Sequence, residues 1–158
     1  MHDVIEKHDG HILNYIGDSI MIVFGAPNEV DDHELKAVEC AVEMRKVLDE
    51  LNDEWDKVEF SRYWKNHGIN KVEARAGIHS GSVIAGNIGS DRMLQYSAIG
   101  DVVNVAARLE QSNKEFGTDI CFSHEIYINL KKDLHDNASL SGEIKLKGRS
   151  SPLKVYSI

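Results

Sequence analysis

The chain has 158 residues, the size of one ordinary folding domain, and it is long enough to bury a hydrophobic core. Its composition, 42% hydrophobic and 28% charged, is that of a globular protein. The formal net charge of -8 argues against a nucleic-acid-binding protein, which would carry a basic face, but it leaves room for a nucleotide held by a few local cations. We therefore expect residues 1–158 to form a single domain.

The expected elements alternate between helices and strands. In the first half they are the end of a helix over residues 1–9, strands over 11–16 and 19–24, a helix over 32–51, and strands over 72–79 and 82–88. In the second half they are a strand over 95–99, a helix over 101–115, a strand over 118–122, a short helix over 124–130, and strands over 143–146 and 154–158. A frayed helix end and a loop are expected over 52–70, a connection over 89–94 and a loop over 133–142. This order predicts an α+β fold, a mixed sheet with helices packed on one side.

Two local signals support the first elements. Gly17 and Asp18 separate two β-rich runs by two residues, which predicts a tight hairpin in which glycine takes the positive φ angle. Asp31 precedes the expected helix and Glu34 follows three residues later, which is the spacing of a capping box.

The two cysteines and the hydropathy pattern indicate the environment of the chain. Cys40 falls in an expected helix and Cys121 in an expected strand, so we expect both thiols to be reduced and packed. The longest apolar run, residues 20–26, is too short to span a bilayer, and no basic segment followed by an apolar one begins the chain. We expect a cytoplasmic domain whose own residues make no contact with a membrane.

Asp18 is the first candidate functional residue. An aspartate at a hairpin is more often a turn residue than a ligand. The strands on either side are strongly apolar, however, so this carboxylate would stand at the end of a buried sheet. Hard cations such as Mg²⁺ take one or two such oxygens together with the phosphates of a substrate. Asp18 is therefore a candidate metal ligand.

The helix expected from Asp101 carries the second set of candidates. Asp101, Asn104 and Arg108 occupy positions i, i+3 and i+7, so they share one helical face. This pattern is also that of an amphipathic helix with a solvated polar stripe. As functional residues, Arg108 would neutralise charge on a phosphoryl group and Asn104 would fix a sugar or phosphate oxygen. Lys147, between the last two strands, is either a surface charge or a contact to a terminal phosphate.

Four stretches match a known family in the right order: YIGDSIMIVFGAP (15–27), AGIHSGSVIAGNIGS (76–90), YSAIGDVVNVAARLE (96–110) and IKLKGRSSPLKVY (144–156). The chain resembles the class III adenylyl/guanylyl cyclase catalytic domain, in its bacterial soluble form. The resemblance implies a ferredoxin-like, palm-type mixed sheet. Compared with the family pattern, the chain begins within the second helix, so we expect a cyclase fold without its N-terminal strand and first helix.

The resemblance also implies an activity and a set of site residues. Such enzymes convert ATP or GTP to a 3′,5′-cyclic nucleotide and pyrophosphate with two Mg²⁺ or Mn²⁺ ions, in an active site formed between two domains. An upstream sensor domain is common in the family. The matching positions are Asp18 for a metal ion, Asn104 for the ribose, Arg108 for the transition state, Lys147 for the terminal phosphates, and Asn14 with Ser97 for the purine. In a homodimer, Asp18 would come from one protomer, and the two helix residues and Lys147 from the other.

Three departures from the family pattern leave alternatives open. The aspartate that binds the first metal ion in the family has no counterpart in the chain, which leaves a second hypothesis, a catalytically inactive cyclase-like module that binds nucleotide or a partner domain. Asn14 stands where adenylyl forms carry Lys and guanylyl forms Glu, and its amide both donates and accepts. Ser97 is equally ambiguous, so the expectation of ATP over GTP rests on family frequency.

Overall fold

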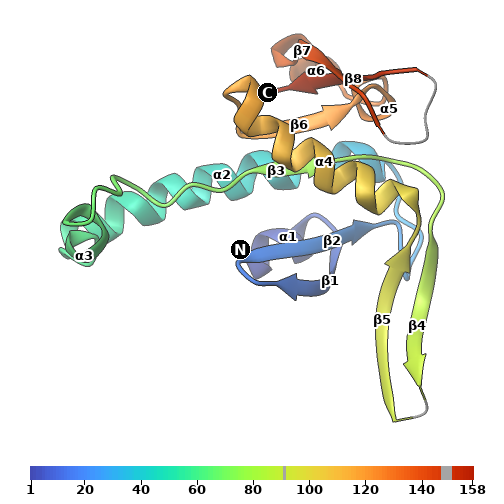
Figure 1. Cartoon of the computed structure of the whole chain (residues 1–158), viewed down its shortest axis with the longest axis horizontal. Helices are drawn as coiled ribbons and strands as arrows, with labels where there is room; N and C mark the ends of the chain where they lie inside the picture. The colour runs from blue at the N-terminus through green and yellow to red at the C-terminus, as the bar shows by residue number, and fades with distance from the viewer. Residues whose placement is uncertain (91, 147–150) are drawn as a thin grey trace.

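The computed structural model describes residues 1–90, 92–146 and 151–158 (Figure 1). In chain order its elements are α1 (His2–Lys7), β1 (Gly10–Ile16), β2 (Ser19–Phe24), α2 (His33–Lys57), α3 (Arg62–Lys65), β3 (Ala76–Ile78), β4 (Ile84–Ser90), β5 (Met93–Ile99), α4 (Asp101–Phe116), β6 (Ile120–Ser123), α5 (His124–Tyr127), α6 (Lys132–Asn137), β7 (Ser139–Ile144) and β8 (Leu153–Ser157). Within this part of the chain, no helix combines the length and the apolar character needed to cross a membrane.

The main sheet has the strand order β3-β6-β8-β7. Strand β3 runs parallel to β6, whereas β8 is antiparallel to both β6 and β7, so the sheet is mixed. Two further antiparallel pairs, β1 with β2 and β4 with β5, lie outside this sheet. The expected α+β class and mixed sheet are confirmed.

Helices cover both faces of the main sheet, and not one face as the sequence suggested. On β6, Phe122 packs into a core cluster with residues of α2, whereas its neighbour Cys121 packs with Val105 and Leu109 of α4. Successive side chains of a strand point to opposite faces, so α2 and α4 lie on opposite sides of β6. The sequence prediction failed here because periodicity shows which face of a helix is apolar and not which side of the sheet it meets.

The β1–β2 hairpin does not join the main sheet and packs on α2 instead. Ile5 of α1 and Cys40 of α2 are fully or almost fully buried in a cluster that also receives apolar side chains from both hairpin strands. The same helix packs on β6 through Leu35 and Val38. Helix α2 is therefore the common support for the hairpin and for the main sheet.

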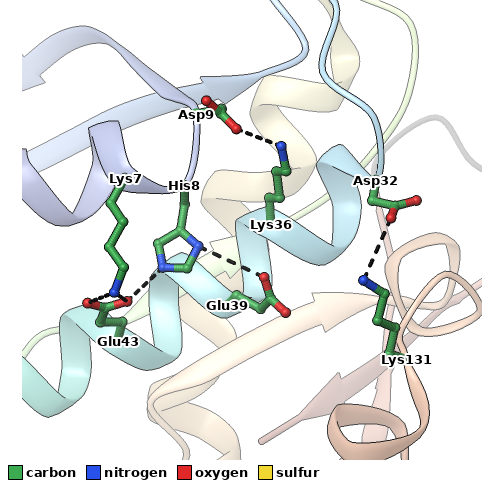
Figure 2. Close-up of polar contacts among 8 residues, drawn as sticks. All are labelled: Lys7, His8, Asp9, Asp32, Lys36, Glu39, Glu43 and Lys131. Carbon is green, nitrogen blue, oxygen red and sulfur yellow. Dashed lines mark hydrogen bonds and ion pairs between the residues drawn. The ribbon is translucent and has the colours of Figure 1, made fainter.

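Charged side chains also fasten α1 to α2 (Figure 2). The Lys7 ammonium donates to both oxygens of Glu43, at 2.7 and 2.8 Å, and His8 Nε2 lies 2.8 Å from Glu43 Oε2. His8 Nδ1 is 3.9 Å from Glu39 Oε2. The further ion pairs in this view are Lys36 with Asp9 at 2.6 Å and Lys131 with Asp32 at 3.8 Å. Hydrogen bonds from Lys7 and His8 lower the pKa of the Glu43 carboxyl below its usual range.

The predicted turn of the first hairpin is confirmed, but the predicted cap of α2 is wrong. Ile16 pairs with Ser19 across Gly17 and Asp18, and Gly17 has a φ angle of 62°. The residue before α2 is Asp32 in the left-handed conformation, and no side chain caps this helix end. Glu34 accepts a hydrogen bond from Ser80 instead of binding the helix end.

Several element boundaries also differ from the sequence prediction. Residues 133–142 were expected to be a loop, but α6 and most of β7 lie there. The strand expected over 72–79 is reduced to the three residues of β3. The β4–β5 ladder continues as far as Ser90 and Met93, into the segment expected to be a connection. α2 extends to Lys57 and α3 follows, where a frayed end and loop were expected.

Both cysteines are buried and unpaired with each other, as the sequence predicted. Burial raises the pKa of the Cys40 thiol to about 11, and it also raises the pKa of Cys121. Since only the thiolate is strongly nucleophilic, both side chains act as apolar core residues at neutral pH.

Gly77 lets the backbones of β3 and α4 come into direct contact. A Cβ atom built on this residue would collide with the carbonyl oxygen of Ala106 and the backbone nitrogen of Glu110. Backbone atoms cannot rotate away as a flexible side chain can, so any side chain at position 77 has to push α4 off the sheet. Gly77 therefore fixes the distance between α4 and the main sheet.

Replacing Gly77 should destabilise the fold strongly. We expect Gly77→Ala to lower the free energy of unfolding by about 1–3 kcal/mol because it over-packs a backbone contact. Gly86→Ala is the matched control, since nothing lies within 4 Å of a Cβ atom there. Urea denaturation measures both, and equal stability of the two variants would contradict the packing account.

Ionisation of Glu43 should make part of the free energy of unfolding depend on pH. Its pKa is lowered in the folded state, so its contribution is present above the ordinary pKa of glutamate and is lost as the pH falls through the folded pKa. We expect Glu43→Gln to lose less stability than the parent between pH 6 and pH 3 in urea titrations. Glu50→Gln, on the same helix with Lys46 at 4.0 Å, is the control. If both variants lose as much stability as the parent, the carboxylate does not clamp α1.

Candidate functional site

The β1–β2 hairpin places two of the predicted site residues. Asn14 lies on β1 directly after a register shift in the ladder, and its side chain is exposed. Asp18 lies in the two-residue turn and is also exposed. The turn places the carboxylate at the tip of the hairpin, where it is open to a ligand in solvent.

Three more of the predicted site residues lie on strand β5 and helix α4. The strand runs directly into the helix (Figure 1). Ser97 is half-buried on β5. Asn104 and Arg108 are exposed and lie four residues apart on α4, while Val105 and Leu109 are buried against the sheet. The apolar side of α4 thus fixes the helix, and the amide and the guanidinium point away from the core one turn apart.

Arg108 makes only weak contacts within its own helix. Its Nη1 donates to Gln111 Oε1 at 3.4 Å, and its Nη2 lies 3.6 Å from Glu115 Oε1. The side chain is 46% exposed, so these contacts add little stability. The guanidinium therefore keeps most of its five donors for a ligand such as a phosphate.

Contacts between β1 and β5 bring the two predicted purine-reading residues into the same region. Gln95 Nε2 of β5 donates to the carbonyl oxygen of Leu13 at 3.4 Å. The rings of His11 and Tyr96 meet edge to face with centroids 5.5 Å apart. Each contact involves an immediate or near neighbour of Asn14 or Ser97, so these residues stand on adjoining strands.

The turn of the β1–β2 hairpin is not directed toward the start of α4 within one copy of the chain. In Figure 1 the turn between β1 and β2 lies at the end of the hairpin that points away from the junction of β5 with α4. Among the described residues there is also no group of three or more His, Cys, Asp or Glu side chains arranged to hold a metal ion. Within one copy, the hairpin turn and the β5–α4 junction therefore lie apart.

The remaining predicted residue, Lys147, lies outside the described residues. The sequence reasoning also missed Gln95 and the His11–Tyr96 pair, which join β1 to β5. Gln95 lies two residues before Ser97 and so on the same face of β5, and this alternation was the available signal.

The chain matches a family model described as the adenylate and guanylate cyclase catalytic domain over residues 1–158. It is 34% identical over 156 residues to adenylate cyclase 1 of Rhizobium meliloti (strain 1021), covering 99% of this chain and 22% of that protein. It is 30% identical to an adenylate cyclase of Anabaena cylindrica, covering 100% of this chain and 30% of that protein. The chain thus spans less than a third of these relatives.

Two solved structures are similar over 99% of this chain. The guanylyl cyclase Cya2 is 31% identical with a TM-score of 0.78, and 73% of it is covered. The adenylyl cyclase CyaB from P. aeruginosa is 30% identical with a TM-score of 0.74, and 74% of it is covered. A mixed α+β architecture with this sequence match defines a class III nucleotide cyclase domain. The chain belongs to the adenylate and guanylate cyclase catalytic domain family.

Proposed function

We propose that the domain is a nucleotide cyclase that converts ATP, with GTP as the alternative substrate, to a 3′,5′-cyclic nucleotide and pyrophosphate. The observation that carries this proposal is the placement of Asn104 and Arg108, one turn apart on the exposed face of α4 in a member of the cyclase family. Ser97, on the strand that leads into this helix, supports the assignment of the same region to the nucleotide.

Arg108 and Asn104 have distinct roles in this reaction. Attack of the ribose 3′ oxygen on the α-phosphorus increases the negative charge on the phosphoryl oxygens and on the leaving pyrophosphate. The Arg108 guanidinium stabilises that charge, which is largest in the transition state. The Asn104 amide holds the ribose so that the 3′ hydroxyl faces the phosphorus. Lys147 would bind the terminal phosphates as a point charge.

Asp18 would hold a divalent cation together with the phosphates of the substrate. One exposed carboxylate fits the coordination habit of Mg²⁺ or Mn²⁺, which take few protein ligands when a polyphosphate supplies the rest. A complete site would hold two such ions, which supply Lewis-acid activation of the 3′ hydroxyl and charge neutralisation of the phosphates.

A second domain would complete the site. The hairpin turn that carries Asp18 points away from the β5–α4 junction within one copy (Figure 1), so a homodimer or a complementary cyclase domain would bring one hairpin turn to the α4 helix of the other subunit. Exposed apolar side chains on the β4–β5 hairpin support such pairing: Ile84 at 75%, Met93 at 76%, Leu94 at 64% and Ile99 at 56% exposure. Exposed apolar side chains at both ends of a hairpin are typical of an interface.

The alternative is a catalytically inactive cyclase-like module that binds nucleotide or a partner domain. It is favoured by one observation: the part of the chain that the structure describes has no group of three or more His, Cys, Asp or Glu side chains that could hold a metal ion. Nucleotide binding without any cyclic product from ATP or GTP in the presence of Mn²⁺ would select this alternative over the enzyme.

Trans-complementation tests the shared site. We expect Arg108→Ala to lower turnover by orders of magnitude while substrate still binds, because its contact forms mainly in the transition state. Asp18→Ala should abolish metal-dependent activity. Mixing the two variants should restore about a quarter of the parental activity, since half of randomly formed dimers are mixed and each keeps one intact site.

Cyclic nucleotide production by the mixture, compared with each variant alone, is the measurement. A mixture no more active than its components would show that Asp18 and Arg108 do not act across an interface. Parental rates in both single variants would show that neither residue has the assigned role.

The purine preference can be tested at Asn14. Its amide offers both a donor and an acceptor, whereas a lysine ammonium only donates. We expect Asn14→Lys to shift the ratio of kcat/KM for ATP over GTP toward ATP by about tenfold, the effect of one hydrogen bond to a charged group. Asn87→Lys adds the same charge at an exposed position on β4 and is the control. An unchanged ratio in Asn14→Lys would refute the assignment.

A further inference from the structure

The segment 79–83 joins β3 to β4 and lies against the beginning of α4. A Cβ atom on Gly81 would stand 2.8 Å from Cγ2 of Val102, in the first turn of α4. A Cβ atom on Gly100, the residue before the helix, would stand 3.4 Å from the carbonyl oxygen of Ser82. The start of α4 is thus in contact with this segment on both sides of Asp101.

Two side chains of this segment make hydrogen bonds to neighbouring elements. Ser80 Oγ donates a hydrogen bond of 2.9 Å to Glu34 Oε1 in the first turn of α2. Glu34 Oε1 also lies 3.1 Å from His33 Nε2, so its carboxylate is held in place. The neighbouring His79, with a side chain only 3% exposed, places Nδ1 2.8 Å from Ser123 Oγ at the end of β6. The segment is therefore tied to α2 on one side and to β6 on the other.

We propose that Ser80, through its hydrogen bond to Glu34, is a positioning residue that sets the first turn of α4 and hence Asn104 for catalysis. This inference rests on the proposed cyclase function. Ser80 directly precedes Gly81 in the sequence, so its influence on α4 would pass through Gly81 to Val102. The capping box that the sequence suggested for Glu34 is replaced by this longer-range contact.

The physical reason lies in the geometry that a cyclisation needs. The 3′ hydroxyl has to face the phosphorus, and a shift of about 1 Å in a positioning group can reduce turnover by up to about 100-fold. Asn104 lies in the first turn of α4, which has no side-chain cap of its own. The segment 79–83 takes the place of such a cap as the support of this helix end.

The test compares Ser80→Ala with Ser141→Ala. Ser141 is an equally half-buried serine whose Oγ donates a 2.7 Å hydrogen bond to Ser157 at the β7–β8 edge, so its removal is the same chemical change away from α4. We expect Ser80→Ala to lower kcat by about tenfold with KM for the metal–nucleotide changed by less than about twofold. Ser141→Ala should keep the parental kcat, and Ser80→Thr, which keeps the hydroxyl, should restore most of it.

Amide hydrogen exchange at residues 102–105 is the second readout, and it does not depend on turnover. Ser80→Ala should exchange faster there than the parent, and Ser141→Ala should not. If the parent makes no cyclic nucleotide, the proposed function fails, and the exchange data alone decide whether Ser80 supports α4. Equal kcat in the two alanine variants of an active enzyme, or equal exchange at 102–105, would overturn the positioning role.

Discussion

The contact between the backbones of β3 and α4 at Gly77 is the constraint on which the candidate site depends. Because no side chain separates the two elements at this point, the backbone of α4 lies in direct contact with β3. Its buried residues Val105 and Leu109 then fill the space against β6, β7 and β8. The opposite face of the same helix has to point outward, and it carries Asn104 and Arg108. Packing on one side of α4 thus determines where the catalytic candidates stand on the other.

Helix α2 positions the hairpin that carries Asp18, the candidate metal ligand, as the main sheet positions α4. It holds the β1–β2 hairpin through an apolar cluster, and it holds the preceding helix α1 through the contacts of Lys7 and His8 with Glu43 (Figure 2). The hairpin and α4 are therefore both fixed relative to the core, and the hairpin turn points away from the β5–α4 junction (Figure 1). This arrangement is a physical reason for proposing a symmetric pair, because moving the turn to α4 within one copy would have to disrupt these clusters.

The elements predicted well from sequence are those with strong local signals. The Gly17–Asp18 turn and the apolar spacing of α4 are local, and both are found in the structure. The strand expected over 143–146 begins earlier, at Ser139, as β7. Residues 139–142 were expected to be a loop because they are polar or exposed, and their strand conformation is defined mainly by pairing with β8. Glu34 was assigned to a cap because its spacing fits one, but a tertiary partner, Ser80, takes its carboxylate. For the site, sequence spacing was sufficient to place Asn104 and Arg108 on one face of a helix. The contacts between β1 and β5 join residues more than 80 positions apart, so they could not be predicted from local sequence.

The most direct test of a site shared between two copies is the dependence of specific activity on protein concentration, with the monomer–dimer equilibrium measured in parallel by sedimentation. If each site needs residues from both copies, product formed per chain should fall on dilution in proportion to the dimer fraction and recover on concentration. Specific activity that stays constant while sedimentation shows the chain to be monomeric would contradict the account, because one copy would then contain a working site.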